Sequence, residues 1–345
     1  MDMKRHHYED VQFLHGWANK FWFAVFVVLV IAAPYMFPAQ LFLISLIGVN
    51  IIIALGLNIL TGNTGQISLG HAGFVAIGAY TTVVLMQSWM IPFPAALIAG
   101  GILAMLFGVI LALPALRLEG PYLAIATLAF GIAIKIILGN IPGLGGHNGI
   151  SVIGMDLGFT MITSEVGIYY VIAGIALVMG IAARNIVKSR VGRAFQAIRD
   201  SDIAASAAGI NLAGYKTMSF MISAFYAGIA GGLWAVLLGY INPNMFEFVV
   251  SIEYFAMVVV GGLGFVAGSV MGAAAVTYLR VNSDNLNSVP VIGWLLDLMS
   301  IDLTVQTGVT WVITGIVLIL VVVLEPLGLY GIWLRIKIYW RTWPF

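Results

Sequence analysis

Few side chains in this 345-residue chain could bind a metal, attack a substrate or hold a nucleotide. His6, His7 and His15 lie close together, but histidines in a polar terminus are more often solvated surface than a metal site. Without cysteine, the chain has no thiolate ligand and no cysteine nucleophile. It also contains no Gly-Lys pair, so it lacks the G-x-x-x-x-G-K-[ST] loop that holds the phosphates of ATP. We therefore expect the chain itself to bind no metal and no cofactor.

The largest cluster of ionised groups is the polar stretch 184–216, RNIVKSRVGRAFQAIRDSDIAASAAGINLAGYK. Six of the fifteen lysines and arginines lie in it: Arg184, Lys188, Arg190, Arg193, Arg199 and Lys216. Basic residues next to hydrophobic segments mark the cytoplasmic side of a membrane protein. Because this stretch also contains acidic residues, alanines and glycines, we expect folded helices that form a docking surface.

The composition excludes an ordinary soluble domain. The chain has 61% hydrophobic and 8% charged residues and a mean hydropathy of +1.06, whereas about a quarter of the residues of a soluble domain are charged. Unpaired backbone groups are not tolerated in lipid, so long hydrophobic runs predict helices. We expect an all-α polytopic membrane protein with about 8 to 10 transmembrane or re-entrant helices and a cytoplasmic coupling loop. The net charge of +1 gives no electrostatic support for nucleic-acid binding.

Hydrophobic runs divide the chain into expected membrane spans: 21–36, 41–60, 67–86, 95–113, 122–138, 168–183, 217–238 and 304–324. The loop after residue 138 has no lysine or arginine before Arg184, so the positive-inside rule places it outside the cell. The same rule places the N-terminus in the cytoplasm. The expected organisation is a cytoplasmic segment 1–20, a transmembrane domain 21–330 and a cytoplasmic or interfacial tail 331–345.

The hydrophobic segment 252–279 is interrupted by GGLG at 261–264 and allows two topologies. A single long span would place the basic C-terminal tail outside. Two segments folded back at GGLG would keep the acidic loop 281–302 outside and the tail inside, and the charge bias favours this arrangement. Its cost is that Arg280 falls on the outer side.

Within the polar stretch, a helix from Arg193 to Arg199 would place Phe195 and Ile198 on one side. Asp200 or Ser201 is a suitable N-cap for a second helix that runs through Ala208. Gly209 is a suitable C-terminal stop. This pattern predicts two short helices that meet at an angle and dock into a groove on a partner. A solvated loop with nascent helix is the alternative.

Four motifs follow one another along the chain: ISLGHAGFVAIGAY, LRLEGPYLAIATLAFG, GRAFQAIRDSDIAASAAGIN and VVVGGLGFVAGSVMGA. Together they resemble the LivM-type permease of branched-chain amino acid ABC importers, from about Leu41 to Tyr330. The resemblance implies that the central loop is a coupling element seated in a groove of a separate ATPase subunit. It assigns the coupling role to matching positions: Arg193, Ala197, Arg199, Asp202, Ala205 and Gly209.

The same resemblance implies a transport subunit rather than an enzyme, which moves branched-chain or related amino acids across the bacterial inner membrane. ATP would be bound by partner ATP-binding cassette subunits. Further implied partners are a LivH-like sister permease forming a heterodimer, a periplasmic substrate-binding protein and membrane lipid. Similar permeases carry urea, amides or aromatic acids, so the substrate stays open. Whether the second permease is a sister chain or a second copy also stays open.

Candidates for the translocation pathway lie near interruptions of the hydrophobic runs. GHAGFVA at 70–76 and GGLGFVA at 261–267 share G-x-x-G-F-V-A, and transporters are often built from inverted repeats with interrupted helices near the midplane. The candidates are Gln66, His71, Gly73, Gly261 and Gly264. Ordinary helix packing through small residues is the alternative explanation.

Two other function classes compete with this hypothesis. A stand-alone channel or ion-coupled carrier for a small neutral solute is compatible with the glycine interruption at 261–264, although paired intramembrane carboxylates or histidines would be expected in a carrier. An intramembrane enzyme has less support. Neither a G-x-S-x-G turn nor a set of His, Asp and Glu at metal spacing lies within the hydrophobic runs.

Overall fold

The computed structural model describes residues 17–118, 120–152, 154–158, 160–282, 315, 319, 325 and 327–342. Its long helices are α2 (Trp17–Met36), α3 (Leu41–Leu57), α4 (His71–Ser88), α5 (Phe93–Ala115), α6 (Pro121–Asn140), α7 (Glu165–Lys188), α10 (Leu212–Leu238), α11 (Phe248–Gly261), α12 (Val266–Val281) and α15 (Gly328–Thr342). Two shorter helices, α8 (Arg190–Asp200) and α9 (Asp202–Ala207), connect α7 to α10. Most of the expected span 304–324, the loop 283–302 and the three N-terminal histidines lie outside the described residues.

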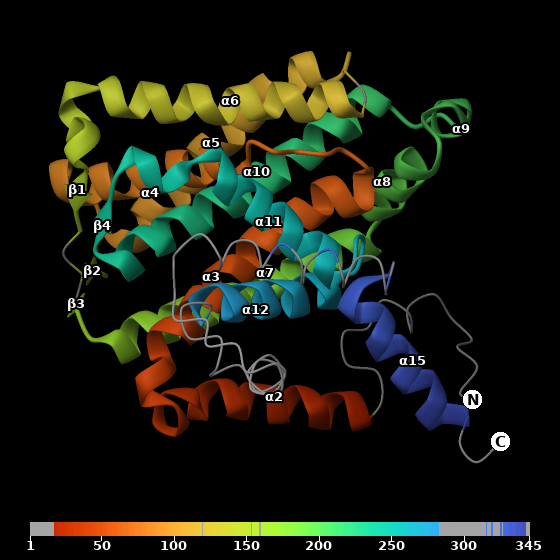
Figure 1. The fold of residues 1–345 in the computed structure, drawn as a ribbon, viewed down its shortest axis with the longest axis horizontal. Coiled ribbons are helices and arrows are strands. Elements are labelled where there is room, and N and C mark those ends of the chain that lie inside the picture. Colours follow the sequence, from red (N-terminus) through yellow and green to blue (C-terminus); the bar gives the residue numbers. More distant parts are fainter. Residues whose placement is uncertain are drawn as a thin grey trace, which may run out of the picture.

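Most of the long helices lie side by side (Figure 1). Five of the described helical segments are long and apolar enough to cross a membrane, and α11 and α12 are shorter apolar helices. Helices α8 and α9 lie at one end of the bundle, which we call the α8–α9 end. Four two-residue strands lie at the opposite strand end: β1 (Ile150–Ser151), β2 (Met155–Asp156), β3 (Met161–Ile162) and β4 (Tyr240–Ile241). The expected class, an all-α polytopic membrane protein, is confirmed.

The strands form two small antiparallel pairs. Strand β1 pairs with β4, which joins the segment before α7 to the end of α10. Strand β2 pairs with β3 within the same connection. Short 3₁₀ turns surround them at η3 (Pro142–Leu144), η4 (Gly146–Asn148) and η5 (Pro243–Phe246), and a further one, η1 (Pro38–Gln40), precedes α3.

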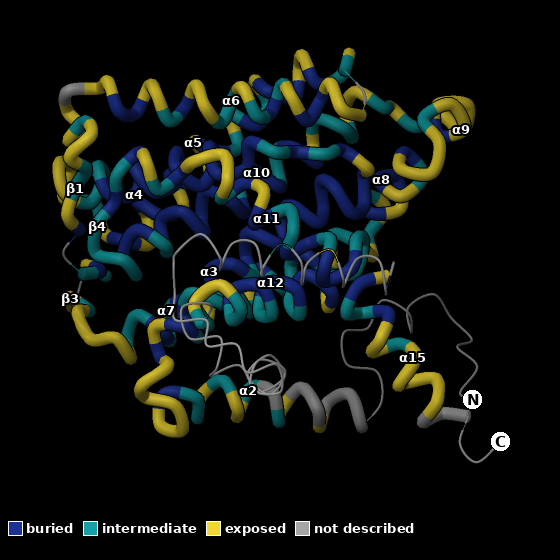
Figure 2. The backbone as a smooth tube through the Cα atoms, viewed as in Figure 1, coloured by how far each residue is buried: buried dark blue, intermediate teal, exposed yellow. Residues whose placement is uncertain are grey.

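Helix α10 forms the centre of the bundle, where it packs against α5, α4 and α3 (Figure 2). The contacts depend on glycine: a Cβ at Gly78 would collide with the backbone of Gly228, and a Cβ at Gly231 with the backbone oxygen of Val75. Small residues of this kind let helix backbones approach closely in a membrane. The small-residue pattern of the third hydrophobic run therefore packs as expected.

Helices α11 and α12 form an antiparallel hairpin folded at GGLG. Glu253, near the start of α11, pairs with Arg280, near the end of α12, at 2.7 Å between carboxylate and guanidinium. At the folded end, a Cβ at Gly261 would collide with the carbonyl oxygen of Gly268. The fold-back at GGLG is confirmed for the described residues, whereas the sides of the membrane on which the loop and the tail lie stay a prediction. The ion pair also removes its apparent cost, because Arg280 is neutralised by a carboxylate that is 8% exposed.

Two local expectations about the second and third runs were wrong. Helix α4 begins at His71 rather than at residue 67, and Leu69, two residues before it, donates its backbone N–H to the Thr127 hydroxyl of α6 at 2.9 Å. The second run was expected to end at residue 60, but α3 continues as η2 (Asn58–Asn63), a π-helical segment. Single π turns within helices are often found at functional sites.

Candidate functional site

A side-chain cap begins each of the helices α8 and α9. The Ser189 hydroxyl accepts from the backbone N–H groups of Val191 and Gly192 at the start of α8. The Ser201 hydroxyl accepts from the N–H of Ala204 at 3.2 Å, so Ser201 is the N-cap of α9, whereas Asp200 ends α8. Gly209 follows α9 with φ +81°, a conformation that glycine adopts without strain. The two expected helices and their stop are confirmed.

One face of α8 is buried against the bundle. Phe195 and Ile198 are buried as expected, and the Phe195 ring lies edge-on to Tyr215 of α10 at 6.2 Å between centroids. Arg193 lies on the exposed side of α8, and its guanidinium donates to the Lys188 carbonyl at 3.3 Å. Ala197 is half-buried. Packing on one side and charge on the other fix the orientation of α8 at the surface.

Helix α9 is held on α10 by its first turn. The Asp202 carboxylate pairs with the Lys216 ammonium at 2.5 Å. The side chain of Ala205 is 2% exposed. Both of these predicted coupling residues therefore lie on the side of α9 that faces the bundle.

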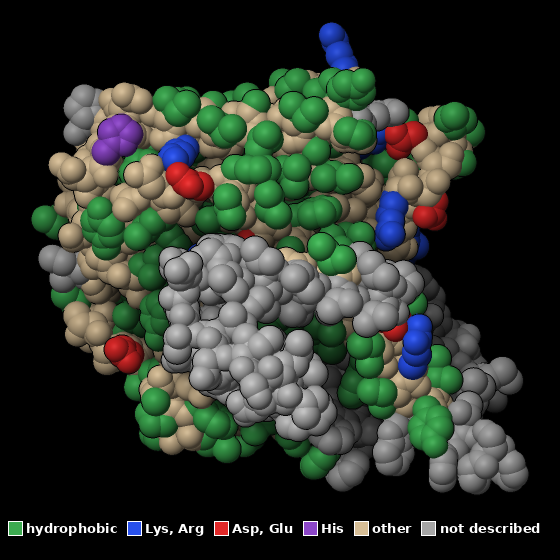
Figure 3. All heavy atoms as spheres, in the orientation of Figure 1, with side chains coloured by type: hydrophobic (Ala, Val, Ile, Leu, Met, Phe, Trp, Pro, Cys, Tyr) green, Lys and Arg blue, Asp and Glu red, His purple; other side chains and the backbone are tan. Residues whose placement is uncertain are grey.

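Ile203 was not singled out from the sequence, yet it is a strongly exposed residue of α9. Its side chain is 82% exposed, next to a surface hollow of about 290 Å³ lined by Leu116, Ser206 and Leu212 among others. Charged side chains gather over α8 and α9 around it (Figure 3). The available signal was a large apolar residue on the first turn of a helix otherwise made of alanine and polar residues. Ile203 forms an apolar patch together with Leu116 and Leu212 of the hollow, and an apolar patch with a polar rim is typical of a protein contact.

Arg199 brings the predicted coupling and pathway residues together. Its guanidinium donates to the Gly62 carbonyl in η2 at 2.5 Å. A Cβ at Gly264, in the break between α11 and α12, would lie 2.9 Å from the same guanidinium. Sequence reasoning missed Asn58, whose side chain binds the backbone of Gly264 and Phe265. No local pattern could have indicated these contacts, because the partners are far apart along the chain.

The other predicted pathway residues lie in tight packing. His71 is fully buried, and neither ring nitrogen has a hydrogen-bond partner among the described residues. A Cβ at Gly73 would lie 3.1 Å from Gly131 of α6. Gln66 is buried and accepts from the Ser219 hydroxyl at 3.3 Å. These residues line the contacts of α4 with α6 and α10, whereas Gly261 and Gly264 belong to the α11–α12 hairpin.

The two copies of G-x-x-G-F-V-A take different conformations. In the first copy, Gly73 and Phe74 lie inside α4. In the second, Gly264 and Phe265 lie in the break before α12, and Gly264 has φ +87°. The shared letters therefore do not mark equivalent positions of a structural repeat.

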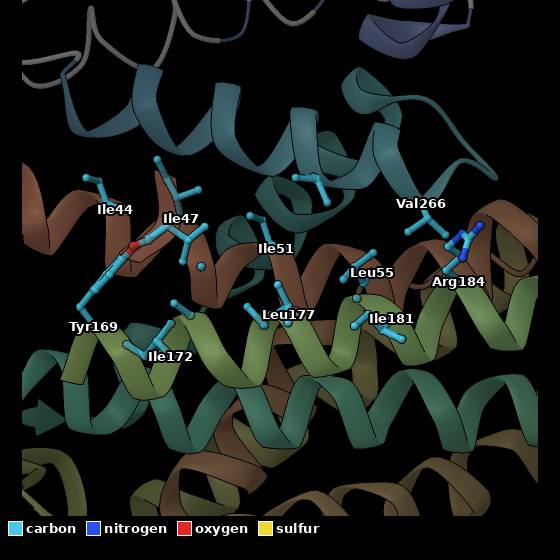
Figure 4. A pocket seen from close by; sticks show the side chains of 16 residues that line it. Ile44, Ile47, Ile51, Leu55, Tyr169, Ile172, Leu177, Ile181, Arg184 and Val266 are labelled. Atoms are coloured by element: carbon cyan, nitrogen blue, oxygen red, sulfur yellow. The ribbon is translucent and has the colours of Figure 1, made fainter. Parts of the chain in front are cut away.

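An apolar groove of about 370 Å³ lies between α3, α7 and α12 (Figure 4). Tyr169 lies at one end of it and Arg184 at the other. The lining does not include the predicted pathway residues. Among the described residues, no group of three or more His, Asp and Glu could hold a metal ion.

Comparison with known proteins shows which family the sequence matches. The profile of the family described as branched-chain amino acid transport system / permease component matches residues 40–322. The chain is 33% identical over 311 residues to the high-affinity branched-chain amino acid transport system permease protein LivM of Escherichia coli, which covers 82% of this chain and 73% of that protein. The LivM protein of Salmonella typhimurium is 32% identical over the same shares.

More distant similarity extends to a second permease type. The high-affinity branched-chain amino acid transport system permease protein LivH of Salmonella typhimurium is 27% identical over 244 residues, covering 64% of this chain and 77% of that protein. No solved structure matches the chain.

Proposed function

This chain belongs to the family of permease components of branched-chain amino acid transport systems, and from that premise we propose that it is the membrane-spanning subunit of an ABC importer. It moves branched-chain or related amino acids across the inner membrane, driven by ATP hydrolysis in a separate subunit. The N-terminus and the α8–α9 end face the cytoplasm. The basic residues of the polar stretch support this orientation.

The observation that carries the proposal is the shape of the α8–α9 end. Two capped helices, α8 and α9, expose one large apolar side chain, Ile203. Both helices are fixed to the bundle by contacts with α10. The Asp202–Lys216 pair fixes α9 on α10, and α8 is fixed by the burial of Phe195. A rigid knob with one exposed apolar residue suits a groove on a folded partner. The ATPase subunit is that partner.

The roles of the coupling residues follow from their positions. Arg193 and Ile203 would contact the ATPase subunit directly, since both are exposed. Ala205, which is buried, and Asp202, which pairs with Lys216, would hold α9 against the bundle. Gly209 provides the left-handed turn after α9, and Ala197 lies at the edge between the buried and exposed faces of α8.

The translocation pathway would pass the interrupted helices, where Gln66, His71, Gly73, Gly261 and Gly264 lie. Buried polar groups within a membrane are costly and tend to be functional. The buried ring of His71, beside the start of α4, supports this placement. The partners are completed by a LivH-like sister permease, a periplasmic substrate-binding protein and membrane lipid. Similarity to both LivM and LivH proteins supports the pairing of two permeases.

Reconstitution tests the proposal. Proteoliposomes containing the chain, a sister permease and the two encoded ATPase subunits should take up radiolabelled leucine only when binding protein and ATP are both supplied. Radiolabelled urea and phenylalanine in parallel vesicles separate the substrate classes. Uptake by the chain alone, without ATP, would instead support a channel or ion-coupled carrier.

A further inference from the structure

Arg199 was expected at the partner surface, but its guanidinium is turned toward the membrane helices. It donates to the carbonyl of Gly62, the fifth residue of η2, at 2.5 Å. Its aliphatic stem lies over Gly65, where a Cβ would be 3.4 Å from the arginine Cγ. A guanidinium is always charged, and its hydrogen bonds to oxygen are strong. One end of this side chain therefore belongs to α8 and the other to the end of α3.

Asn58 makes the second link, between the end of α3 and the α11–α12 break. Its side-chain oxygen accepts from the N–H of Gly264 at 2.8 Å, and its side-chain nitrogen donates to the carbonyl of Phe265 at 3.1 Å. Asn58 is 1% exposed, so both bonds are sheltered from water. The first bond satisfies the Gly264 N–H, which the break leaves without a helical partner, and the second is made to the Phe265 carbonyl, which also accepts from the N–H of Ser269 in α12.

Glycine makes this three-way contact possible. A side chain on Gly62 would collide with Asn58 and with the backbone of Gly264. A Cβ on Gly264 would lie 2.9 Å from the Arg199 guanidinium, and the φ of +87° at this residue also favours glycine. The break in α3–α4, the break in α11–α12 and the last turn of α8 therefore meet at a single junction.

We propose that Arg199 is a positioning residue that ties the α8–α9 surface to both helix breaks, so that a displacement of α8 moves the η2 turn and the α11–α12 break together. The inference rests on the proposed function, since the displacement of α8 comes from the ATPase subunit. It goes beyond docking because it names the route by which the docking surface reaches the interrupted helices. Packed elements linked by hydrogen bonds carry such coupling between sites.

Two measurements test this proposal separately from the proposed function. The first is amide hydrogen exchange on the full chain in detergent. Arg199→Gln should increase exchange at both 58–66 and 262–266, because one bond holds the two breaks against α8. Arg117→Gln, at an exposed arginine after α5, is the control and should leave both segments unchanged. Faster exchange at only one segment, or at neither, would overturn the junction.

The second measurement is the number of leucine molecules transported per ATP in the reconstituted complex. Arg199→Gln should lower this ratio about tenfold while ATP hydrolysis continues. Arg199→Lys, which keeps a charged donor, should restore most of the ratio, a result that loss of stability alone does not explain. Thermal melting of each variant accompanies the assay. A ratio for Arg199→Gln equal to that of the unmodified chain overturns the proposal even though the complex transports leucine.

A complex that does not assemble, or that takes up no solute with ATP, counts against the proposed function instead. The hydrogen-exchange result still decides whether Arg199 joins the two breaks.

Discussion

The centre of the bundle and its α8–α9 end both depend on glycine, but for different physical reasons. In the centre, Gly78, Gly228 and Gly231 have ordinary helical conformations, and a side chain on any of them would strike a neighbouring helix. At the α8–α9 end, Gly209 and Gly264 have positive φ, and no described atom lies within 4 Å of a Cβ at Gly209. Glycine provides close contact in the first region; in the second, Gly209 provides backbone shape, and Gly264 provides both shape and close contact.

This difference indicates where the molecule can move. Helices in backbone contact cannot shift without separating, so α4, α5 and α10 form a fixed core. At the breaks, close glycine contacts are combined with hydrogen bonds from Arg199 and Asn58, and these hydrogen bonds can rearrange at smaller cost. We therefore expect the centre of the bundle to be rigid and motion to occur at the junction with α8.

The largest effect is expected from filling a contact in the centre. Gly231→Leu would force α10 away from the Val75 carbonyl of α4 and lower the free energy of unfolding by about 3 kcal/mol. Gly174→Leu is the matched control, because no described atom outside its own helix lies within 4 Å of its Cβ position. Thermal melting in detergent measures both. Equal melting temperatures for the two variants would remove the distinction between the regions.

A smaller effect is expected in the α11–α12 hairpin, which combines both kinds of feature. Arg280→Gln leaves the buried Glu253 carboxylate without its partner and should cost about 2 kcal/mol. Glu253→Gln combined with Arg280→Gln removes the uncompensated charge and should recover most of that loss. If the double variant melts as low as Arg280→Gln, the ion pair does not hold the hairpin, and close glycine packing must do so.

The smallest effect is expected at Gly209. Gly209→Ala places a Cβ in open space but at φ +81°, so only backbone strain remains, about 1 kcal/mol. Gly209→Asn should cost less, because asparagine tolerates this conformation. Hydrogen exchange of residues 202–210 reports the change locally. A loss as large as that of Gly231→Leu would mean that Gly209 makes a contact rather than a turn.

Much of the fold could be predicted from hydrophobic runs and cap residues. Pro121 begins α6, GGLG separates α11 from α12, and Gly209 follows α9. Such signals are local, because each depends on the backbone preferences of one or two residues. The family was also predicted correctly from four motifs, and the profile match over residues 40–322 confirms it.

The start of α4 could not be predicted, because a hydrophobic run does not show whether its first residues are helical; residues 67–70 are not, and Leu69 contacts Thr127 of α6. The same limit applies to the candidate site. Asp202 and Ala205 have types suited to a docking surface, but the fold turns them toward α10 and the interior. Arg199 carries a charge suited to a partner, yet its guanidinium binds Gly62. The direction of a side chain depends on elements far away in sequence.

The central claim is that the α8–α9 end receives the ATPase subunit, and site-specific photocrosslinking tests it most directly. A photoreactive phenylalanine analogue replaces Ile203 in one variant and Met161, 60% exposed at the strand end, in the other. In the purified complex, we expect crosslinks to the ATPase subunit from position 203 and none from position 161. In a separate binding measurement, Ile203→Asp should weaken binding of the ATPase subunit about tenfold. Crosslinks to the ATPase from position 161, or their absence from position 203, would contradict the central claim.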